Sequence, residues 1–290
     1  MTFVYHMLNG IHIGSVYALV ALGYSMVYGI VKLINFAHGD IIMVGAYVMW
    51  YIISSLGLPV WLGILASIVS CVILGMAIEK IAYKPLRNSA RISLLITAIG
   101  VSLLLENLAQ LIFTSTPKTF PGFITGGIKI GDKTVSTTTF VTIGVSIAIM
   151  IGLTLLVSKT KMGKAMRAVS EDSDAARLMG INVDNTISFT FAIGSALAAV
   201  AAILYCSSYP QVSATMGSAL GLKAFVAAVL GGIGSIPGAV IGGFSIGILE
   251  ALTKGYISSS LADAIVFGIL IITLLIKPTG ILGKNVAEKV

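Results

Sequence analysis

Long apolar runs dominate this sequence and constrain its fold more than any other feature. A helix rises about 1.5 Å per residue, so about 20 apolar residues cross a bilayer core of about 30 Å. Nine apolar elements can be delimited: Leu8–Val31, Ile41–Leu56, Leu58–Ile78, Ile92–Phe113, Thr139–Ser158, Ile187–Tyr205, Lys223–Ile236, Gly238–Thr253 and Leu261–Ile276. The expected fold is all-α, a polytopic transmembrane helical bundle of about nine elements (eight to ten) that forms one domain over residues 1–290.

Composition excludes the other broad classes of protein. Hydrophobic residues make up 57% of the chain and charged residues only 10%, whereas a soluble domain carries about 25% charge. The chain therefore cannot be a soluble enzyme, a disordered chain or a disulfide-stapled module. Its net charge of +7 does not indicate a nucleic-acid partner, because the basic residues lie in short stretches between apolar runs. Cys71 and Cys206 lie in or beside such runs, which favours two buried free thiols.

Several elements are too short to span a bilayer alone. The runs Ile41–Leu56, Lys223–Ile236, Gly238–Thr253 and Leu261–Ile276 reach only about 21–24 Å as helices. Lipid cannot satisfy exposed backbone groups, so such segments must be buried among other helices, break midway or line a cavity. We expect a packed bundle with broken helices.

The distribution of lysine and arginine sets the expected orientation. With the loop 159–186 placed inside, thirteen basic residues fall on the inner side, Lys284 and Lys289 among them, and five on the outer side, Lys223 among them. This positive-inside bias places the N-terminus outside and the C-terminus on the cytoplasmic side. The expected location is a bacterial-type inner or plasma membrane, which the chain crosses several times. The first run lacks a basic leader and a cleavage site, so we expect a permanent span.

A loop rich in Thr, Gly and Pro covers residues 114–138 and is expected outside. Alternation over residues 128–135, around Gly131 and Asp132, predicts a small β-hairpin within it.

A weak internal repeat links the two ends of the chain. Gly14–Ala21 and Gly194–Ala201 agree at five of eight positions, at an offset of 180 residues. A bias toward small residues could produce this likeness by chance. The two copies would cross the membrane in opposite directions, however, and each is followed by a loop and a short element. Interrupted segments at matching places in inverted halves indicate a central translocation site, and therefore a transporter.

The segment 159–184 holds nine charged residues and is expected to be a cytoplasmic coupling loop. Ser170 is expected to cap a short helix there, and Gly180 to end it. Ala175, Leu178 and Met179 would form an apolar stripe outside the bilayer. Two interpretations remain open: a connector that packs on its own protein, or a docking helix for a cytosolic partner.

Long motifs in this chain resemble a known family. Asp174-Ala175-Ala176-Arg177-Leu178-Met179-Gly180 is similar to the Glu-Ala-Ala-x-x-x-Gly loop of ABC-importer membrane subunits, with Asp in place of Glu. Further likeness to the Liv-type branched-chain amino-acid permeases lies in residues 29–40, 162–168, 180–182, 223–238 and 277–283. The likeness covers nearly the whole chain, and the loop 114–138 is its poorest part.

The resemblance implies a permease subunit of an ATP-driven importer for leucine, isoleucine and valine. The family pairs this subunit with a second membrane subunit, two cytosolic ATPases and an extracytoplasmic binding protein. The chain contains no Gly-x-x-x-x-Gly-Lys-Ser/Thr phosphate loop. We therefore expect a transport subunit that is not an enzyme and binds no cofactor or metal, with ATP used by a partner subunit.

Two groups of candidate residues follow. The expected ATPase-coupling residues are Gly163, Arg167, Glu171, Asp174, Ala175, Ala176, Arg177, Leu178 and Gly180. The candidates for the translocation path or gate are Asn35, His38, Asp40, Gly231, Gly232 and Gly234. Each gate candidate also has a structural interpretation, because Asp40 could cap a helix starting at Ile41 and the glycines could simply break a helix.

Three other functions remain open from the sequence alone. A related ABC permease could carry a sugar or urea. An ion-coupled secondary transporter would work alone, with Glu106 as a candidate proton-coupling acid, although pairing within the bundle is the simpler interpretation of this residue. A membrane scaffold that transports nothing is disfavoured by the broken helices. Glu250 and Asp263 lie near element ends and are expected at the interface.

Overall fold

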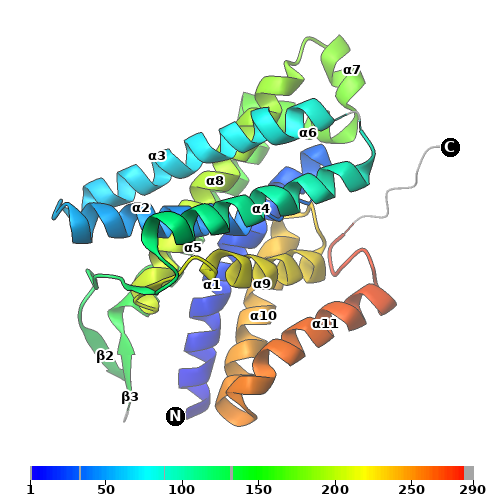
Figure 1. Ribbon diagram of the computed structural model, residues 1–290. Coiled ribbons are helices and arrows are strands. Elements are labelled where there is room, and N and C mark those ends of the chain that lie inside the picture. The colour runs from blue at the N-terminus through cyan, green and yellow to red at the C-terminus, as the bar shows by residue number, and fades with distance from the viewer. Residues whose placement is uncertain (1, 33, 88, 131–132, 284–290) are drawn as a thin grey trace.

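The computed structural model describes residues 2–32, 34–87, 89–130 and 133–283 as a bundle of tilted helices (Figure 1). The nine expected apolar elements are all helical. They are α1 (Thr2–Val31), α2 (His38–Trp50), α3 (Val60–Ile78), α4 (Arg91–Phe113), α5 (Thr137–Lys159), α8 (Val183–Ser208), α9 (Met216–Gly231), α10 (Ile236–Tyr256) and α11 (Ala262–Ile276). The described part of the chain therefore confirms the all-α class.

Short elements complete the fold. Two helices, α6 (Lys161–Glu171) and α7 (Ser173–Leu178), connect α5 to α8. Single π-helical turns extend α2 (Tyr51–Ser55) and α3 (Glu79–Tyr83). Short 3₁₀ turns precede α4 (Lys84–Leu86) and α11 (Ser259–Leu261). The strands are β1 (Lys118–Thr119), β2 (Gly127–Ile130), β3 (Lys133–Ser136) and β4 (Gln211–Val212).

The predicted hairpin is present. Strands β2 and β3 pair antiparallel, with Gly127 opposite Ser136 and Ile130 opposite Lys133. The expected turn residues Gly131 and Asp132 lie outside the described residues. Strand β1 pairs with β4, which follows α8, so the 114–138 loop is tied to the bundle. We call this end of the molecule, with the N-terminus, the hairpin end, and the opposite end the α7 end (Figure 1).

Seven of the described helices are long and apolar enough to cross a membrane. Helix α2 has 13 residues and α9 has 16, which confirms that these two elements fall short of a full span. The same expectation is wrong for the last two elements, because the helical segments there, Ile236–Tyr256 and Ser259–Ile276, extend beyond the apolar runs and have 21 and 18 residues. The most apolar window of α1 is 83% buried inside the protein, against 17% for α4 and 11% for α11. Helix α1 is therefore central, and the exposed apolar side chains of α4 and α11 are suited to lipid or to another membrane subunit.

Small residues allow the central helices to approach closely. Gly10 and Gly14 of α1 face α10 at Ile248 and Phe244, and Gly243 of α10 faces Ala18. A Cβ atom built on Gly243 would lie 2.5 Å from the Ala18 Cα atom, closer than two non-bonded carbon atoms can approach. The small-xxx-small spacing of α10 therefore serves helix packing.

We expect Gly243→Val to separate α1 from α10 and to lower the thermal unfolding temperature of the purified protein markedly, because backbone atoms block the new side chain and cannot move aside cheaply. Gly144→Val is the matched control, since a Cβ there has no neighbour within 4 Å. Equal unfolding temperatures for the two variants would contradict the close packing.

The inverted repeat extends over three helices of each half. Adding 180 to the bounds of α1, α2 and α3 leads to α8, α9 and α10 within a few residues. The contacts follow the same relation, because α1 packs on α10 as α8 packs on α3, and α1 contacts α9 as α8 contacts α2. Helices α1 and α8 run in opposite directions (Figure 1). The eight-residue likeness thus belongs to a structural repeat.

Two boundaries differ from expectation. Helix α1 begins at Thr2, six residues early, because its polar first turns line a cavity instead of entering lipid. Helix α9 begins at Met216, so Lys223 lies inside a helix rather than in an outer loop. Its ammonium group pairs with Glu250 at 2.9 Å and Asp263 at 2.6 Å, which compensates the cost of placing it there. Lys284 and Lys289 lie outside the described residues.

Candidate coupling and translocation sites

Helices α6 and α7 form a projecting connector at the α7 end (Figure 1). Thr160 caps α6, its Oγ1 accepting a hydrogen bond from the Gly163 amide at 3.0 Å. Gly163 is buried against the carbonyl groups that end α5, where a Cβ atom would collide with the Val157 oxygen. Met166 and Val169 bury the same face of α6. The connector is therefore seated firmly on α5.

The predicted cap at Ser170 is wrong. Helix α6 continues through Ser170, whose hydroxyl donates to the Arg167 carbonyl at 2.7 Å. The break comes at Asp172, which adopts an extended conformation, and its carboxylate accepts from the amides of Asp174 and Ala175, both at 2.9 Å. A carboxylate at this position also complements the positive end of the α7 dipole. The expected helix end is correct, since Gly180 has φ +82°.

Helix α7 presents its apolar side chains outward. Leu178 is 89% exposed and Met179 83%, whereas Ala176 is 4% exposed and packs inward. Of the expected coupling residues, Gly163 and Ala176 are buried and the others are exposed: Arg167, Glu171, Asp174, Ala175, Arg177, Leu178 and Gly180. Large apolar side chains in water are unfavourable unless a partner covers them, so this surface is suited to docking.

A charged cluster, not found from the sequence, joins the start of α8 to the end of α3. The Arg87 guanidinium pairs with Asp184, in the first turn of α8, at 2.6 Å, and also with Glu79 at the end of α3. Glu79 is fully buried and accepts a further hydrogen bond from Ser188 at 2.6 Å. Glu79 and Arg87 lie eight residues apart in the sequence, so their proximity could be expected from one segment. No sequence pattern indicates that Asp184, 97 residues further along, also pairs with Arg87.

The start of α2 buries three polar candidates: Asn35, His38 and Asp40 are each 2% exposed or less. Asn35 accepts a hydrogen bond from the Tyr83 hydroxyl at 2.7 Å. His38 packs edge-on against Tyr24, with ring centroids 4.8 Å apart. The interpretation of Asp40 as a cap is wrong, because α2 begins at His38 and Asp40 already lies within its first turn.

The glycine segment after α9 is a tight turn. Gly232 and Gly234 have φ +106° and +89°, which favours glycine. A Cβ atom on Gly231 would collide with Gly238, so α9 and α10 meet closely here. Asp40, in contrast, adjoins Gly217 in the first turn of α9. The two groups of gate candidates thus lie at opposite ends of α9, about 20 Å apart at 1.5 Å per residue.

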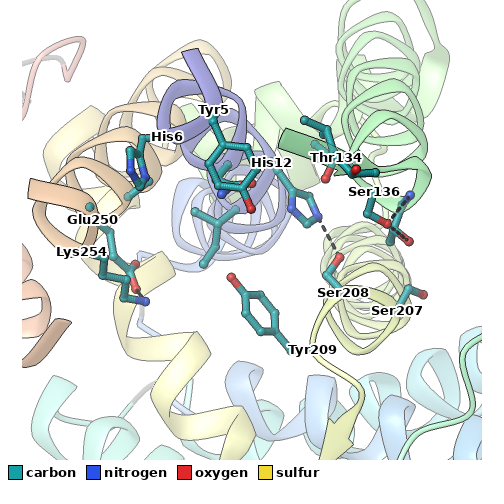
Figure 2. A pocket seen from close by; sticks show the side chains of 17 residues that line it. Tyr5, His6, His12, Thr134, Ser136, Ser207, Ser208, Tyr209, Glu250 and Lys254 are labelled. Atoms are coloured by element: carbon teal, nitrogen blue, oxygen red, sulfur yellow. Dashed lines mark hydrogen bonds and ion pairs between the residues drawn. The ribbon is translucent and has the colours of Figure 1, made fainter. Parts of the chain in front are cut away.

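A cavity of about 460 Å³ opens near the hairpin end (Figure 2). Its walls come from α1, β3, α5, α8 and α10, and are largely polar. The labelled lining residues are Tyr5, His6, His12, Thr134, Ser136, Ser207, Ser208, Tyr209, Glu250 and Lys254. The sequence alone assigned no role to His6 or His12. In the structure, a hydrogen bond of 2.8 Å between His12 Nε2 and the Ser208 hydroxyl links α1 to α8.

Glu250, on α10, is one of the residues that line this cavity. It is 1% exposed, which the expectation of an interfacial position did not anticipate. Its carboxylate accepts from the Tyr17 hydroxyl at 2.5 Å, Lys223 at 2.9 Å and Lys254 at 2.6 Å. Helices α1, α9 and α10 are joined through this one side chain, and its charge is fully compensated.

A bundle of membrane-length helices with inverted halves, a polar cavity at one end and an exposed apolar surface on α7 at the other is the architecture of a transport permease. The chain belongs to the family described as "Branched-chain amino acid transport system / permease component", whose model matches residues 6–275. It is 44% identical to the high-affinity branched-chain amino acid transport system permease protein LivH of Escherichia coli K12, over 99% of this chain and 98% of that protein. It is 42% identical to BraD of Pseudomonas aeruginosa PAO1, over 99% of each chain.

The fold is also similar to that of a solved structure. A chain of PsaBC from Streptococcus pneumoniae, in complex with Fab, matches with a TM-score of 0.50 and 18% identity, covering 93% of this chain and 91% of that one. At this identity the similarity concerns the fold. It agrees with the all-α permease architecture that the helices themselves define.

Proposed function

We propose that this chain is the permease subunit of an ATP-driven importer for branched-chain amino acids. The observation that carries the coupling to a separate ATPase is the exposed apolar surface of α7, where Leu178 and Met179 project into solvent. The substrate class follows that of LivH and BraD, permeases of branched-chain amino acid transport systems, which match over almost their full lengths.

The partners follow from the same proposal. Two cytosolic ATPases would bind α7, a second permease subunit would cover the exposed faces of α4 or α11, and an extracytoplasmic binding protein would deliver the amino acid. The α7 end would then be cytoplasmic and the hairpin end external. The polar cavity of Figure 2 would be an outer vestibule.

ATP binding and hydrolysis would move α7 as a lever. Motion reaches the bundle only if the ATPase binds the two states of the permease with different affinities. The rigid seat of α6 on α5 and the Arg87 cluster between α8 and α3 provide connections for that motion. The gate candidates form two groups at opposite ends of α9, and each group would respond separately to this motion. One group lies at the start of α2 and contains Asn35, His38 and Asp40. The other lies between α9 and α10 and contains Gly231, Gly232 and Gly234.

Reconstitution tests the proposal. Proteoliposomes that contain this chain, its second permease subunit and the ATPases should take up leucine when ATP and a binding protein are present. Omitting the ATPases should reduce uptake at least tenfold. Uptake by this chain alone under an ion gradient would contradict the proposal and support a secondary transporter, and uptake of a sugar or urea in place of leucine would overturn the substrate.

A further inference from the structure

One wall of the polar cavity in Figure 2 carries both a cation and an anion. Lys254 lies in the last turn of α10 and Glu250 lies one turn earlier; both line the cavity and pair with each other at 2.6 Å. The volume of about 460 Å³ is that of a small-molecule site. The other walls come from α1, β3, α5 and α8, so a bound molecule would meet five elements of the fold at once.

Lys254 is able to bind an incoming carboxylate. Its side chain is 42% exposed, and its ammonium group has three N–H donors, of which the bond to Glu250 uses one. Glu250 does not depend on this bond alone, because it also accepts from Tyr17 at 2.5 Å and from Lys223 at 2.9 Å. Lys254 can therefore turn its donors toward a ligand without leaving a buried charge unpaired.

The same wall offers acceptors to an ammonium group. A carboxylate has about four lone-pair sites, and three donors bind Glu250, two of them on Oε1 and only Tyr17 on Oε2. The hydroxyl group of Tyr209 points into the same space, and Ser208 lines it from α8 (Figure 2). The charge of Glu250 and these hydroxyl oxygens suit a primary ammonium group.

The charge balance of the cavity favours a ligand that carries both signs. Lys254 and Lys223 pair with Glu250, and Lys223 also pairs with Asp263, so two cations and two anions form one network with no net charge. A ligand with a single charge would leave this network unbalanced, whereas a zwitterion adds one charge of each sign. Apolar side chains complete the lining, among them Ile13 and Val135 on the walls facing α10, and they suit an aliphatic group.

We propose that this cavity binds a zwitterionic aliphatic amino acid, with its carboxylate on Lys254, its ammonium group beside Glu250 and Tyr209, and its side chain against Ile13 and Val135. The inference rests on the proposed function and deepens it, because it assigns a first binding site for the branched-chain amino acid to this subunit alone. The site lies at the hairpin end, where the binding protein would release its amino acid.

Cysteine protection tests the site. Both native cysteines, Cys71 and Cys206, are fully buried, whereas Thr134 is exposed on β3 and lines the cavity. In the complete complex in nanodiscs, with no binding protein added, leucine should slow labelling of T134C by a water-soluble thiol reagent at least fivefold. At the same concentration, 4-methylpentanoate lacks the ammonium group and 3-methylbutan-1-amine lacks the carboxylate, so each should slow it less than twofold. S158C, at the exposed end of α5, is the control and should label at one rate throughout.

Lys254→Gln in the T134C background tests the assigned contact. The leucine concentration for half protection should rise at least tenfold, the loss expected for one charge-assisted hydrogen bond. The concentration of 3-methylbutan-1-amine should not rise, because this ligand has no carboxylate to lose its partner. Lys254→Arg keeps the charge and should retain most of the protection by leucine.

A purely structural role for Lys254 would weaken the binding of both ligands alike in Lys254→Gln, and that result would overturn the assignment. Equal protection by leucine and by either analogue in the T134C complex would overturn the site. If Lys254→Gln fails to assemble, the comparison of the three ligands decides by itself.

Uptake and protection together separate the two proposals. ATP-driven leucine uptake without protection at T134C would refute the cavity site and leave the importer intact. Protection without any ATP-dependent uptake would support leucine binding in the cavity and contradict the proposed transport. Neither uptake nor protection would overturn both.

Discussion

Replacing Leu178 by glutamate is expected to release the ATPases and to reduce ATP-dependent leucine uptake more than tenfold. Leu178 is 89% exposed, so its side chain contributes almost nothing to the permease itself. Covered by a partner, a leucine contributes about 2 kcal/mol, which corresponds to roughly a 30-fold change in affinity. A buried glutamate would add a desolvation cost. Co-purification of the ATPases with the tagged permease and uptake in proteoliposomes measure the two effects.

Two further variants make this test specific. Leu178→Met keeps an apolar side chain of similar size and should retain both binding and uptake. Ala176→Glu should behave differently from Leu178→Glu, because Ala176 is 4% exposed and a carboxylate there would unseat α7 from the permease. If Leu178→Glu lowered the unfolding temperature of the isolated permease as Ala176→Glu does, the side chain would be a packing residue and the docking surface would be refuted.

Replacing Arg87 by alanine is expected to cause the largest loss of stability at the α7 end. Glu79 is fully buried, and Arg87 is its only cationic partner among the residues that the structure describes. Removing one partner of a buried pair costs about 3–5 kcal/mol, because the other charge stays buried and unpaired. The same change also removes the ion pair between Arg87 and Asp184 in the first turn of α8. We expect a lower unfolding temperature for the purified complex and weaker coupling of ATP hydrolysis to uptake.

The matched control lies in the same cluster. Lys84 pairs with Asp184 at 2.8 Å, but both side chains are nearly half exposed, and such pairs contribute less than about 1 kcal/mol. Lys84→Ala should therefore have a small effect. The double variant Glu79→Gln, Arg87→Ala should recover part of the stability that Arg87→Ala loses. A loss in the double variant equal to or larger than that of Arg87→Ala would show that the cost does not come from an unpaired Glu79.

Much of the fold could be predicted from local patterns. The nine apolar runs mark the nine long helices, and the alternation before α5 marks the β2–β3 hairpin. The offset of 180 residues marks the structural repeat, because related packing faces require small residues at related positions. Ser170 was misjudged as a cap, since a serine inside a helix can satisfy its hydroxyl on the preceding turn. The carboxylate of Asp172 two residues later caps α7 instead.

The sites depended on contacts that local patterns do not encode. Arg87 and Asp184 lie 97 residues apart, and Tyr17 and Glu250 lie 233 residues apart. Hydrophobic periodicity tells which residues of a helix turn inward, but not which side chain of another helix they meet. Asp40 looked like a helix cap for the same reason, and only the structure shows that it lies inside the first turn of α2 and is fully buried.

By itself, the sequence determined the main elements of the protein: a helical membrane bundle of about nine apolar elements, a charged loop between the fifth and sixth of them, and no phosphate loop. These properties follow from composition, helix length and motif spacing, which act within one segment at a time. Only the tertiary structure decided which charges pair, where the polar cavity opens, and that Ala176 is buried beside an exposed Leu178. The rotation and crossing of packed helices set these features, and both depend on the shapes of all neighbouring side chains together.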